Sequence, residues 1–209
     1  LFIMSTKNLI LSSSGLKNIV SAAEQNDEFQ FIFGQQRIVM KNVFAEFISP
    51  AVSKIHQSDP TINFINFNDK LKDITLSEDL ISKFALLSKG DTIEINEEES
   101  FQMKIISILV NNTELFSKLN DLYSYEINET DIDHFLTNLT IFSKISSSFD
   151  CFDYSNIVDM ISSHFYSIDK KKLKEVPKSI LYSIISNSNL RLESEDSLLE
   201  FINDIFNEE

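Results

Sequence analysis

The chain of 209 residues has 32 acidic and 18 basic residues, which give it a formal net charge of −14. Because cationic groups that release counterions supply most of a protein's affinity for nucleic acid, this charge argues against nucleic acid, and equally against an anionic membrane surface, as a partner. The apolar content of 43% predicts a soluble globular protein, and no apolar run approaches the roughly 20 residues needed to span a bilayer.

Cysteine, histidine and glycine are too sparse for the common catalytic and metal-binding arrangements. The single cysteine, Cys151, cannot form an intramolecular disulfide, which favours a reducing compartment, cytoplasmic or nuclear. His56, His134 and His164 lie on three different predicted helices, and three glycines in all cannot build a phosphate-binding loop. We therefore expect no catalytic residue, no metal and no cofactor, and predict that the protein is not an enzyme.

Residues 1–28 are predicted to form an N-terminal extension. Leu16, Ile19, Val20 and Ala23 follow the i, i+3, i+4, i+7 spacing of a short amphipathic helix. Two interpretations remain open: the helix packs on its own domain, or it pairs with a second copy of the chain.

Residues 29–67 hold the densest succession of predicted elements. Residues 29–33 and 37–41 predict a β-hairpin, with Gly34 in the turn. A helix with an apolar stripe of Val43, Phe44, Phe47 and Ile48 must end near Ser49, because the residue before Pro50 avoids the α region. Ser49 and Pro50 then begin a second short helix, residues 51–56. Residues 61–67 predict a strand that is covered on both faces.

Capping residues organise the next segment. Ser77, followed by two carboxylates, begins a helix with Leu80, Ile81, Phe84 and Leu87 at helical spacing, and Gly90 ends it. A short strand, residues 92–95, leads to Asn96 and an acidic first turn of another helix. Thr113 is predicted to cap one more.

From about residue 125 onward the patterns are helical only. Predicted helices begin at the capping box Thr130-x-x-Asp133, at Asp153, at Pro177 and at Ser194. The last of these carries Leu198, Leu199, Ile202 and Ile205. The basic residues within 170–174 are interpreted as a solvated linker or, alternatively, as a docking patch for an acidic partner. The change of pattern predicts a boundary between residues 126 and 127.

This order of elements resembles a BTB/POZ domain followed by a BACK-type helical region. Three phrases carry the resemblance: KNVFAEFISPAVSKI, LLSKGDTIEINEEESFQMKIISILVNNTEL and LKEVPKSILYSIISNSNLRLESEDSLLEFINDIF. The resemblance implies an α+β fold, with a BTB/POZ-like small sheet flanked by helices in residues 29–126 and an all-α BACK-like region in residues 127–209. The acidic residue of the family's cullin-contact motif is missing at Lys83-Phe84-Ala85.

The function implied by this resemblance is that of a non-enzymatic adaptor that self-associates, recruits protein partners, or does both, in some cases for a cullin ubiquitin ligase. The alternative is a scaffold component of a larger assembly with no ubiquitin role. For the adaptor, the resemblance implies a separate recognition domain, which would lie beyond Glu209. We expect Leu16, Ile19 and Val20 to mediate self-association. A partner would contact a second set of residues: Ile81, Lys83, Phe84, Lys89 and Asp91.

Overall fold

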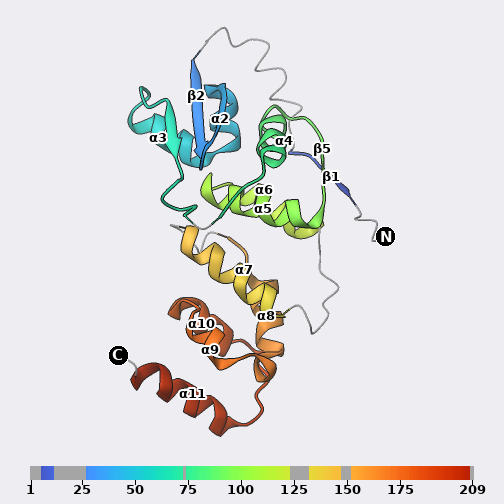
Figure 1. The fold of residues 1–209 in the computed structure, drawn as a ribbon, viewed down its shortest axis with the longest axis vertical. Helices are drawn as coiled ribbons and strands as arrows, with labels where there is room; N and C mark the ends of the chain where they lie inside the picture. Colours follow the sequence, from blue (N-terminus) through green and yellow to red (C-terminus); the bar gives the residue numbers. More distant parts are fainter. Residues whose placement is uncertain (1–5, 12–26, 73, 123–131, 147–151, 208–209) are drawn as a thin grey trace. The chain divides into compact units, whose positions relative to one another are not determined.

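The computed structural model describes residues 6–11, 27–72, 74–122, 132–146 and 152–207, and the chain divides into two compact units, Leu1–Ser124 and Tyr125–Glu209 (Figure 1). The boundary predicted from the sequence lies close to this division. The fold is mixed, with many helices and small sheets, so the predicted α+β class is confirmed. Among the described residues no helix is long and apolar enough to cross a membrane.

A three-stranded sheet forms one side of the first unit. β2 (Glu28–Phe33) and β3 (Gln36–Lys41) make the predicted hairpin, and β4 (Phe64–Asn66) pairs with β2 in parallel, which gives the strand order β3-β2-β4. Gly34 has φ +66° in the tight turn, a backbone conformation that glycine adopts without a steric penalty. Its N–H donates to Asn68 Oδ1 (2.8 Å) and so ties the turn to the segment after β4.

The inner face of this sheet is an aromatic core. Successive side chains of a strand point to opposite faces, and Phe29, Phe31 and Phe33 all point inward. Phe31 is fully buried, and its ring lies 5.2 to 6.4 Å from the rings of Phe29, Phe33, Phe67 and Phe84. The sheet, the segment after β4 and helix α4 (Glu78–Ser88) therefore share one core.

The outer face of the sheet is open, which corrects one prediction. The third strand is shorter than expected, and it is not covered on both faces, because Phe64 is 53% exposed and Ile62 is 37% exposed. The apolar run of residues 61–67 predicts a fully buried strand, but only Ile65 and Phe67 turn toward the interior.

Helices α2 (Asn42–Ile48) and α3 (Pro50–Ser58) meet at the predicted corner. Ser49 Oγ accepts a hydrogen bond from the Val52 N–H (3.2 Å), and Pro50 occupies the first turn of α3. The expected apolar stripe of α2 is only partly correct, since Ala45 and Ile48 are its buried residues whereas Val43, Phe44 and Phe47 are half-buried.

Helix α5 (Glu97–Leu109) lies at the centre of the first unit. It is buried from Met103 to Leu109, including the side chain of Lys104, as expected of a helix surrounded by other elements. β5 (Ile93–Ile95), just before α5, pairs with β1 (Lys7–Leu9), a strand that the sequence did not predict.

Side-chain hydrogen bonds join the corner between α2 and α3 to the corner that follows α5. The Ser49 hydroxyl donates to the Val110 carbonyl (2.9 Å), and Asn112 Nδ2 donates to the Ile48 carbonyl (2.8 Å). Asn112 Oδ1 also accepts from the Leu115 N–H (2.8 Å) and so caps α6 (Thr113–Leu122). The predicted cap, Thr113, is therefore wrong by one residue.

The described residues of the second unit form helices only: α7 (Ile132–Ile145), α8 (Ser155–Ser163), the 3-10 turn η3 (Phe165–Ser167), α9 (Lys170–Lys174), α10 (Lys178–Ile185) and α11 (Glu195–Asn207). The basic residues expected in a linker form α9, because Asp169 Oδ1 accepts from the Lys171 N–H (2.9 Å) and caps it. In α11 the predicted apolar stripe is not the buried face: Phe201 is fully buried, whereas Leu199 is 59% exposed.

Candidate interaction surface

The residues predicted to bind partners do not form one surface. Leu16, Ile19 and Val20 lie outside the described residues. Ile81 and Phe84 are buried against the core of the first unit, so they are not available to a partner in this conformation.

Lys89 and Asp91, from the same predicted set, lie at the end of α4. Lys89 is exposed and Asp91 is half-buried, and the backbone N–H of each donates to the Leu86 carbonyl. These bonds close the helix end, where Gly90 has φ +81°. Together with Lys83, these two residues are the members of the predicted set that reach the surface of the first unit.

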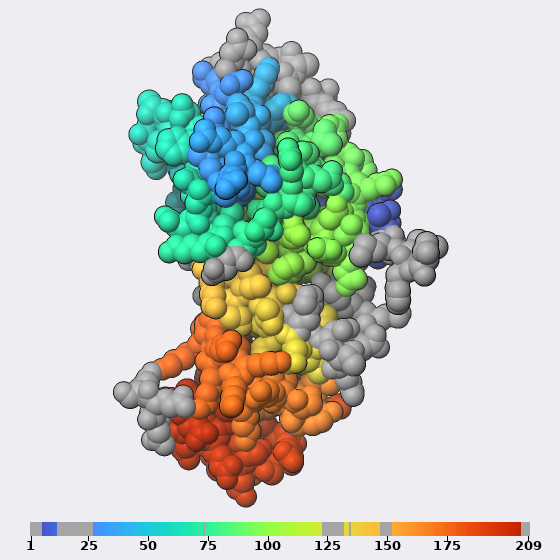
Figure 2. Space-filling model, in the orientation of Figure 1, coloured from blue at the N-terminus to red at the C-terminus, as the bar shows by residue number. Residues whose placement is uncertain are grey.

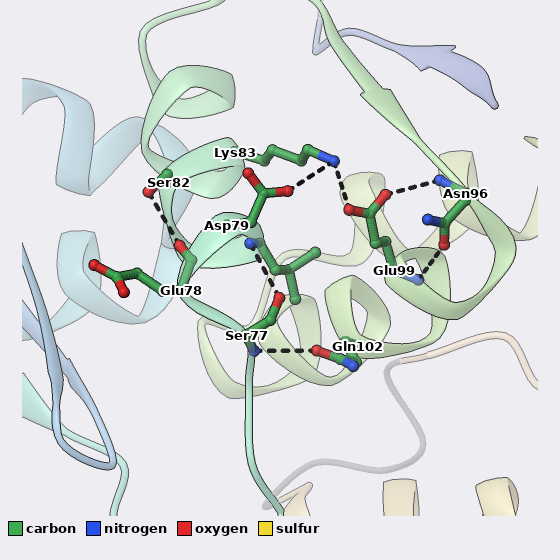
Figure 3. Close-up of polar contacts among 9 residues, drawn as sticks. Ser77, Glu78, Asp79, Ser82, Lys83, Asn96, Glu99 and Gln102 are labelled. Atoms are coloured by element: carbon green, nitrogen blue, oxygen red, sulfur yellow. Dashed lines mark hydrogen bonds and ion pairs between the residues drawn. The ribbon is translucent and has the colours of Figure 1, made fainter.

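Lys83 belongs to a polar network that joins α4 to the start of α5 (Figure 3). Its ammonium group pairs with Glu99 Oε1 and lies 3.0 Å from Asp79 Oδ2. Partial burial by itself would lower the pKa of Lys83, but the hydrogen bonds and charges of Glu99 and Asp79 raise it above its ordinary value.

Glu99 has a second role in this network. Its Oε2 accepts from the Asn96 N–H (2.9 Å) while Asn96 Oδ1 accepts from the Glu99 N–H (2.9 Å), which is the reciprocal capping box of α5 (Figure 3). One carboxylate thus caps α5 and holds Lys83 of α4. The network stabilises the junction of the two helices, and the charge of Lys83 is paired within the chain.

The described histidines and carboxylates do not gather into a chemical centre. Within residues 6–11, 27–72, 74–122, 132–146 and 152–207, no group of three or more His, Cys, Asp or Glu side chains could hold a metal ion. The two ring nitrogens of His56 lie 2.6 Å from Glu46 Oε1 and 2.9 Å from the Ile62 carbonyl oxygen. These contacts fix the ring of His56 between α2 and the segment before β4.

The open outer face of the three-stranded sheet is the strongest candidate for a functional surface. The strand register aligns Val39 of β3, Gln30 of β2 and Phe64 of β4 in one row across this face. Val39 is 50% exposed and Phe64 is 53% exposed. Figure 2 shows the residues of the hairpin, in blue, at the surface of the first unit.

A shallow hollow of about 220 Å³ lies in this row. It is lined by Glu28, Phe29, Gln30, Val39, Asn63 and Phe64. The lining of the hollow is mainly polar, and Val39 and Phe64 are the half-exposed apolar side chains beside it. Exposed apolar side chains next to polar groups are a feature of protein–protein contacts.

Charged residues border the hollow on the same face. Arg37 and Lys41 lie two positions before and after Val39 on β3, and the register places Lys41 opposite Glu28. Arg37 and Glu28 are exposed and Lys41 is half-buried. We refer to Glu28, Arg37, Val39, Lys41 and Phe64 as the sheet-face site.

One signal in the sequence could have indicated this site. In residues 36–41 the inward positions are Ile38 and Met40, so the alternation predicts polar residues at 37, 39 and 41. Val39 departs from that alternation, since it is an apolar residue between two cations on a solvent-facing side. Phe64 gave no such signal because apolar residues occur on both sides of that predicted strand, Ile62 with Phe64 and Ile65 with Phe67.

Neither a protein-family model nor a curated protein matches this chain.

Proposed function

We propose that the protein is a non-enzymatic interaction module, of the BTB–BACK adaptor type, that binds other proteins through the sheet-face site. The observation that carries the proposal is the row of Val39, Gln30 and Phe64 beside a hollow on the outer face of the sheet, in which Val39 and Phe64 are about half exposed. Burial of such apolar area is the main favourable term in protein association. A cytoplasmic or nuclear location is part of the proposal, because a single cysteine cannot form an intramolecular disulfide and so favours a reducing compartment.

The order of elements supports the family assignment within this proposal. A hairpin, two short helices that meet at Ser49 and Pro50, and a third strand parallel to the first are followed by α4, β5, α5 and α6. A unit whose described secondary structure is helical comes next. This is the succession that the resemblance to BTB/POZ and BACK regions implies.

A paired capture experiment tests the proposal. The complete chain is immobilised on a support, incubated with cell extract and cross-linked to the proteins that bind it. The captured proteins are then quantified by mass spectrometry for the wild type and for the double variant Val39→Asp with Phe64→Asp. A charge placed at the centre of an interface is expected to reduce specific capture by about tenfold or more. Both positions are about half exposed, so each substitution should lower the free energy of unfolding by about 1 kcal/mol or less.

Leu86→Asp is the matched control. Leu86 is 44% exposed on α4, within the segment expected from the sequence to contact a partner, and it lies outside the sheet-face site. Capture that survives Leu86→Asp but not the double variant supports the proposal. Capture that the double variant leaves unchanged, or that Leu86→Asp abolishes instead, refutes it.

Self-association and ubiquitin-ligase recruitment are separate parts of the proposal. Light scattering across a range of protein concentrations tests self-association, because a strict monomer removes it. Binding to a purified cullin amino-terminal domain distinguishes the adaptor from the scaffold: binding favours the adaptor, and its absence favours a scaffold component with no ubiquitin role.

A further inference from the structure

The outer edge of β3 presents backbone groups that no other strand of the described residues uses. β3 is a terminal strand in the order β3-β2-β4. In an antiparallel pair, residues alternate between those that bond to the neighbouring strand and those whose N–H and C=O point away from it. The hydrogen bond from the Asn42 N–H to the Asp27 carbonyl (3.0 Å) identifies these two residues as a bonded pair, and this determines which residues of β3 bond to β2 and which point away.

Every second pair from Asn42 and Asp27 is a bonded pair, so Met40 bonds to Phe29 and Ile38 bonds to Phe31. The residues between them on β3, which are Lys41, Val39 and Arg37, direct their backbone groups away from β2. The bonds on the other side of β2 agree with this assignment, since the Gln30 N–H donates to the Asn63 carbonyl and the Ile32 carbonyl accepts from the Phe67 N–H. Gln30 and Ile32 are opposite Val39 and Arg37 and face β4. Among the described residues, the outward groups of β3 that no strand bonds to are therefore the N–H and C=O of Arg37 and Val39 and the N–H of Lys41.

The charges on this edge select the partner. Arg37 and Lys41 flank the half-exposed Val39, and no described ion pair involves either cation. Glu28, opposite Lys41 on β2, is the acidic residue that faces this edge from the neighbouring strand. In a chain of net charge −14, an edge strand whose two charged residues on one face are both basic is a local exception.

These same cations disfavour a second copy as the occupant. An antiparallel pair of two β3 edges centred on Val39 would bring Arg37 of each copy opposite Lys41 of the other. Like charges directly opposite each other destabilise a strand pair, and charged residues are a common protection of free edges.

We propose that β3 is a docking edge for an extended acidic segment of a partner protein, in which two carboxylates alternate with an apolar residue. The segment adds to the sheet as an antiparallel strand. Its carboxylates lie opposite Arg37 and Lys41, and its apolar residue lies beside Val39 on the same face of the sheet. This inference rests on the proposed function and names the chemistry of the partner.

The probe is a fluorescent peptide, Thr-Glu-Thr-Val-Thr-Glu-Thr, titrated with the complete chain and followed by anisotropy. The matching peptide with Lys in place of both Glu residues should bind about tenfold more weakly, because two opposite-charge pairs become like-charge pairs. N-methylation of the peptide Val removes its bond to the Val39 carbonyl and should weaken binding by about tenfold. N-methylation of the Thr after it, whose N–H points to solvent, is the control.

A variant of the chain provides the reciprocal test. Arg37→Glu with Lys41→Glu should invert the preference, so that the Lys peptide binds more tightly than the Glu peptide. If this variant fails to fold by circular dichroism, the peptide changes measured against the wild-type chain still decide the question.

Three results would overturn the inference: no binding of the Glu peptide, equal binding of the Glu and Lys peptides, or binding that survives N-methylation of the Val. A dimer that Val39→Pro abolishes would also overturn it, because the edge would then belong to a second copy. If the peptide fails while Val39→Asp with Phe64→Asp still abolishes capture, only the edge inference is wrong. The proposed function then stands.

Discussion

Both units of the chain begin helices with side-chain caps, but the named caps differ in whether they also bond to a second element. In the first unit Ser49, Asn112 and Glu99 each cap a helix and also bond to a second element. In the described part of the second unit, the side-chain caps Asp169 and Ser194 form hydrogen bonds only within the first turn of their own helices. A cap with two roles connects distant segments, whereas a cap with one role only begins a helix.

Buried aromatic residues differ between the units in a similar way. Phe31 and Phe201 are both fully buried, but Phe31 contacts four rings of the first unit whereas Phe201 contacts one, that of Phe165 (5.9 Å). We therefore expect the two buried side chains to contribute different amounts to the free energy of unfolding. Matched substitutions can measure this difference.

The largest effect is expected for Phe31→Ala. It should lower the free energy of unfolding of the first unit by about 4 to 5 kcal/mol, because it leaves a cavity among several rings that cannot all move to fill it. Phe201→Ala should cost about 3 kcal/mol, at the low end for a buried Phe. Urea unfolding of both variants checks the order, and a larger loss for Phe201→Ala would contradict the comparison.

Removal of a cap with two roles should have the next largest effect. Asn112→Ala removes the α6 cap and leaves the buried Ile48 carbonyl without its donor, which together should cost about 2 to 3 kcal/mol. Ser194→Ala removes only an exposed cap and should cost about 1 kcal/mol or less. Equal losses in thermal unfolding would mean that the bond between the corners contributes nothing.

Lys104→Met should stabilise the first unit by about 1 to 2 kcal/mol at about pH 7. Burial lowers the pKa of Lys104 to about 8, and the nearby charge of Glu97 offsets only part of this effect. A fall from 10.5 to about 8 corresponds to a penalty on the order of 3 kcal/mol for keeping this amine charged.

The advantage of Lys104→Met should depend on pH in one direction. Between about pH 8 and pH 10.5 the unfolded chain binds more protons at this residue than the folded chain, so the wild type gains stability as the pH rises. The difference between variant and wild type should therefore shrink across this window. The exposed Lys89→Met is the control, and an advantage that stays constant up to pH 10.5 would contradict the burial of a charged amine at position 104.

The smallest effect is expected in the hairpin turn. Gly34→Ala should cost about 1 kcal/mol, because Gly34 has φ +66° while an added Cβ would meet no atom within 4 Å. The cost is therefore one of backbone conformation alone. Gln35→Ala, next to it in the exposed turn, should change the free energy of unfolding by less than about 0.5 kcal/mol. A loss above about 3 kcal/mol for Gly34→Ala would point to a steric clash instead.

Local signals in the sequence predicted most of the helices and the hairpin. Ser49, Ser77, Asn96 and Ser194 cap helices as expected, because capping depends on residues three or four positions apart. Lys104 should have been noticed as well, since it stands between Met103 and Ile105 in a helix whose neighbouring positions are apolar.

The sequence could not predict features that depend on distant segments. The pairing of β1 with β5 joins Lys7 to Ile95, and the second bond of Asn112 reaches Ile48. The same reason explains the sheet-face site: whether Phe64 is covered depends on which element packs over β4, and no pattern near Phe64 contains that information. Residues of the predicted partner segment, Ile81 and Phe84, instead form part of the core.

The most direct test of the account is hydrogen–deuterium exchange of the complete chain, alone and bound to a purified partner. If the sheet-face site is the binding surface, exchange should slow in residues 36–41 and 62–66 and remain unchanged in α4. Slower exchange in α4, with no change in the sheet, would contradict the account.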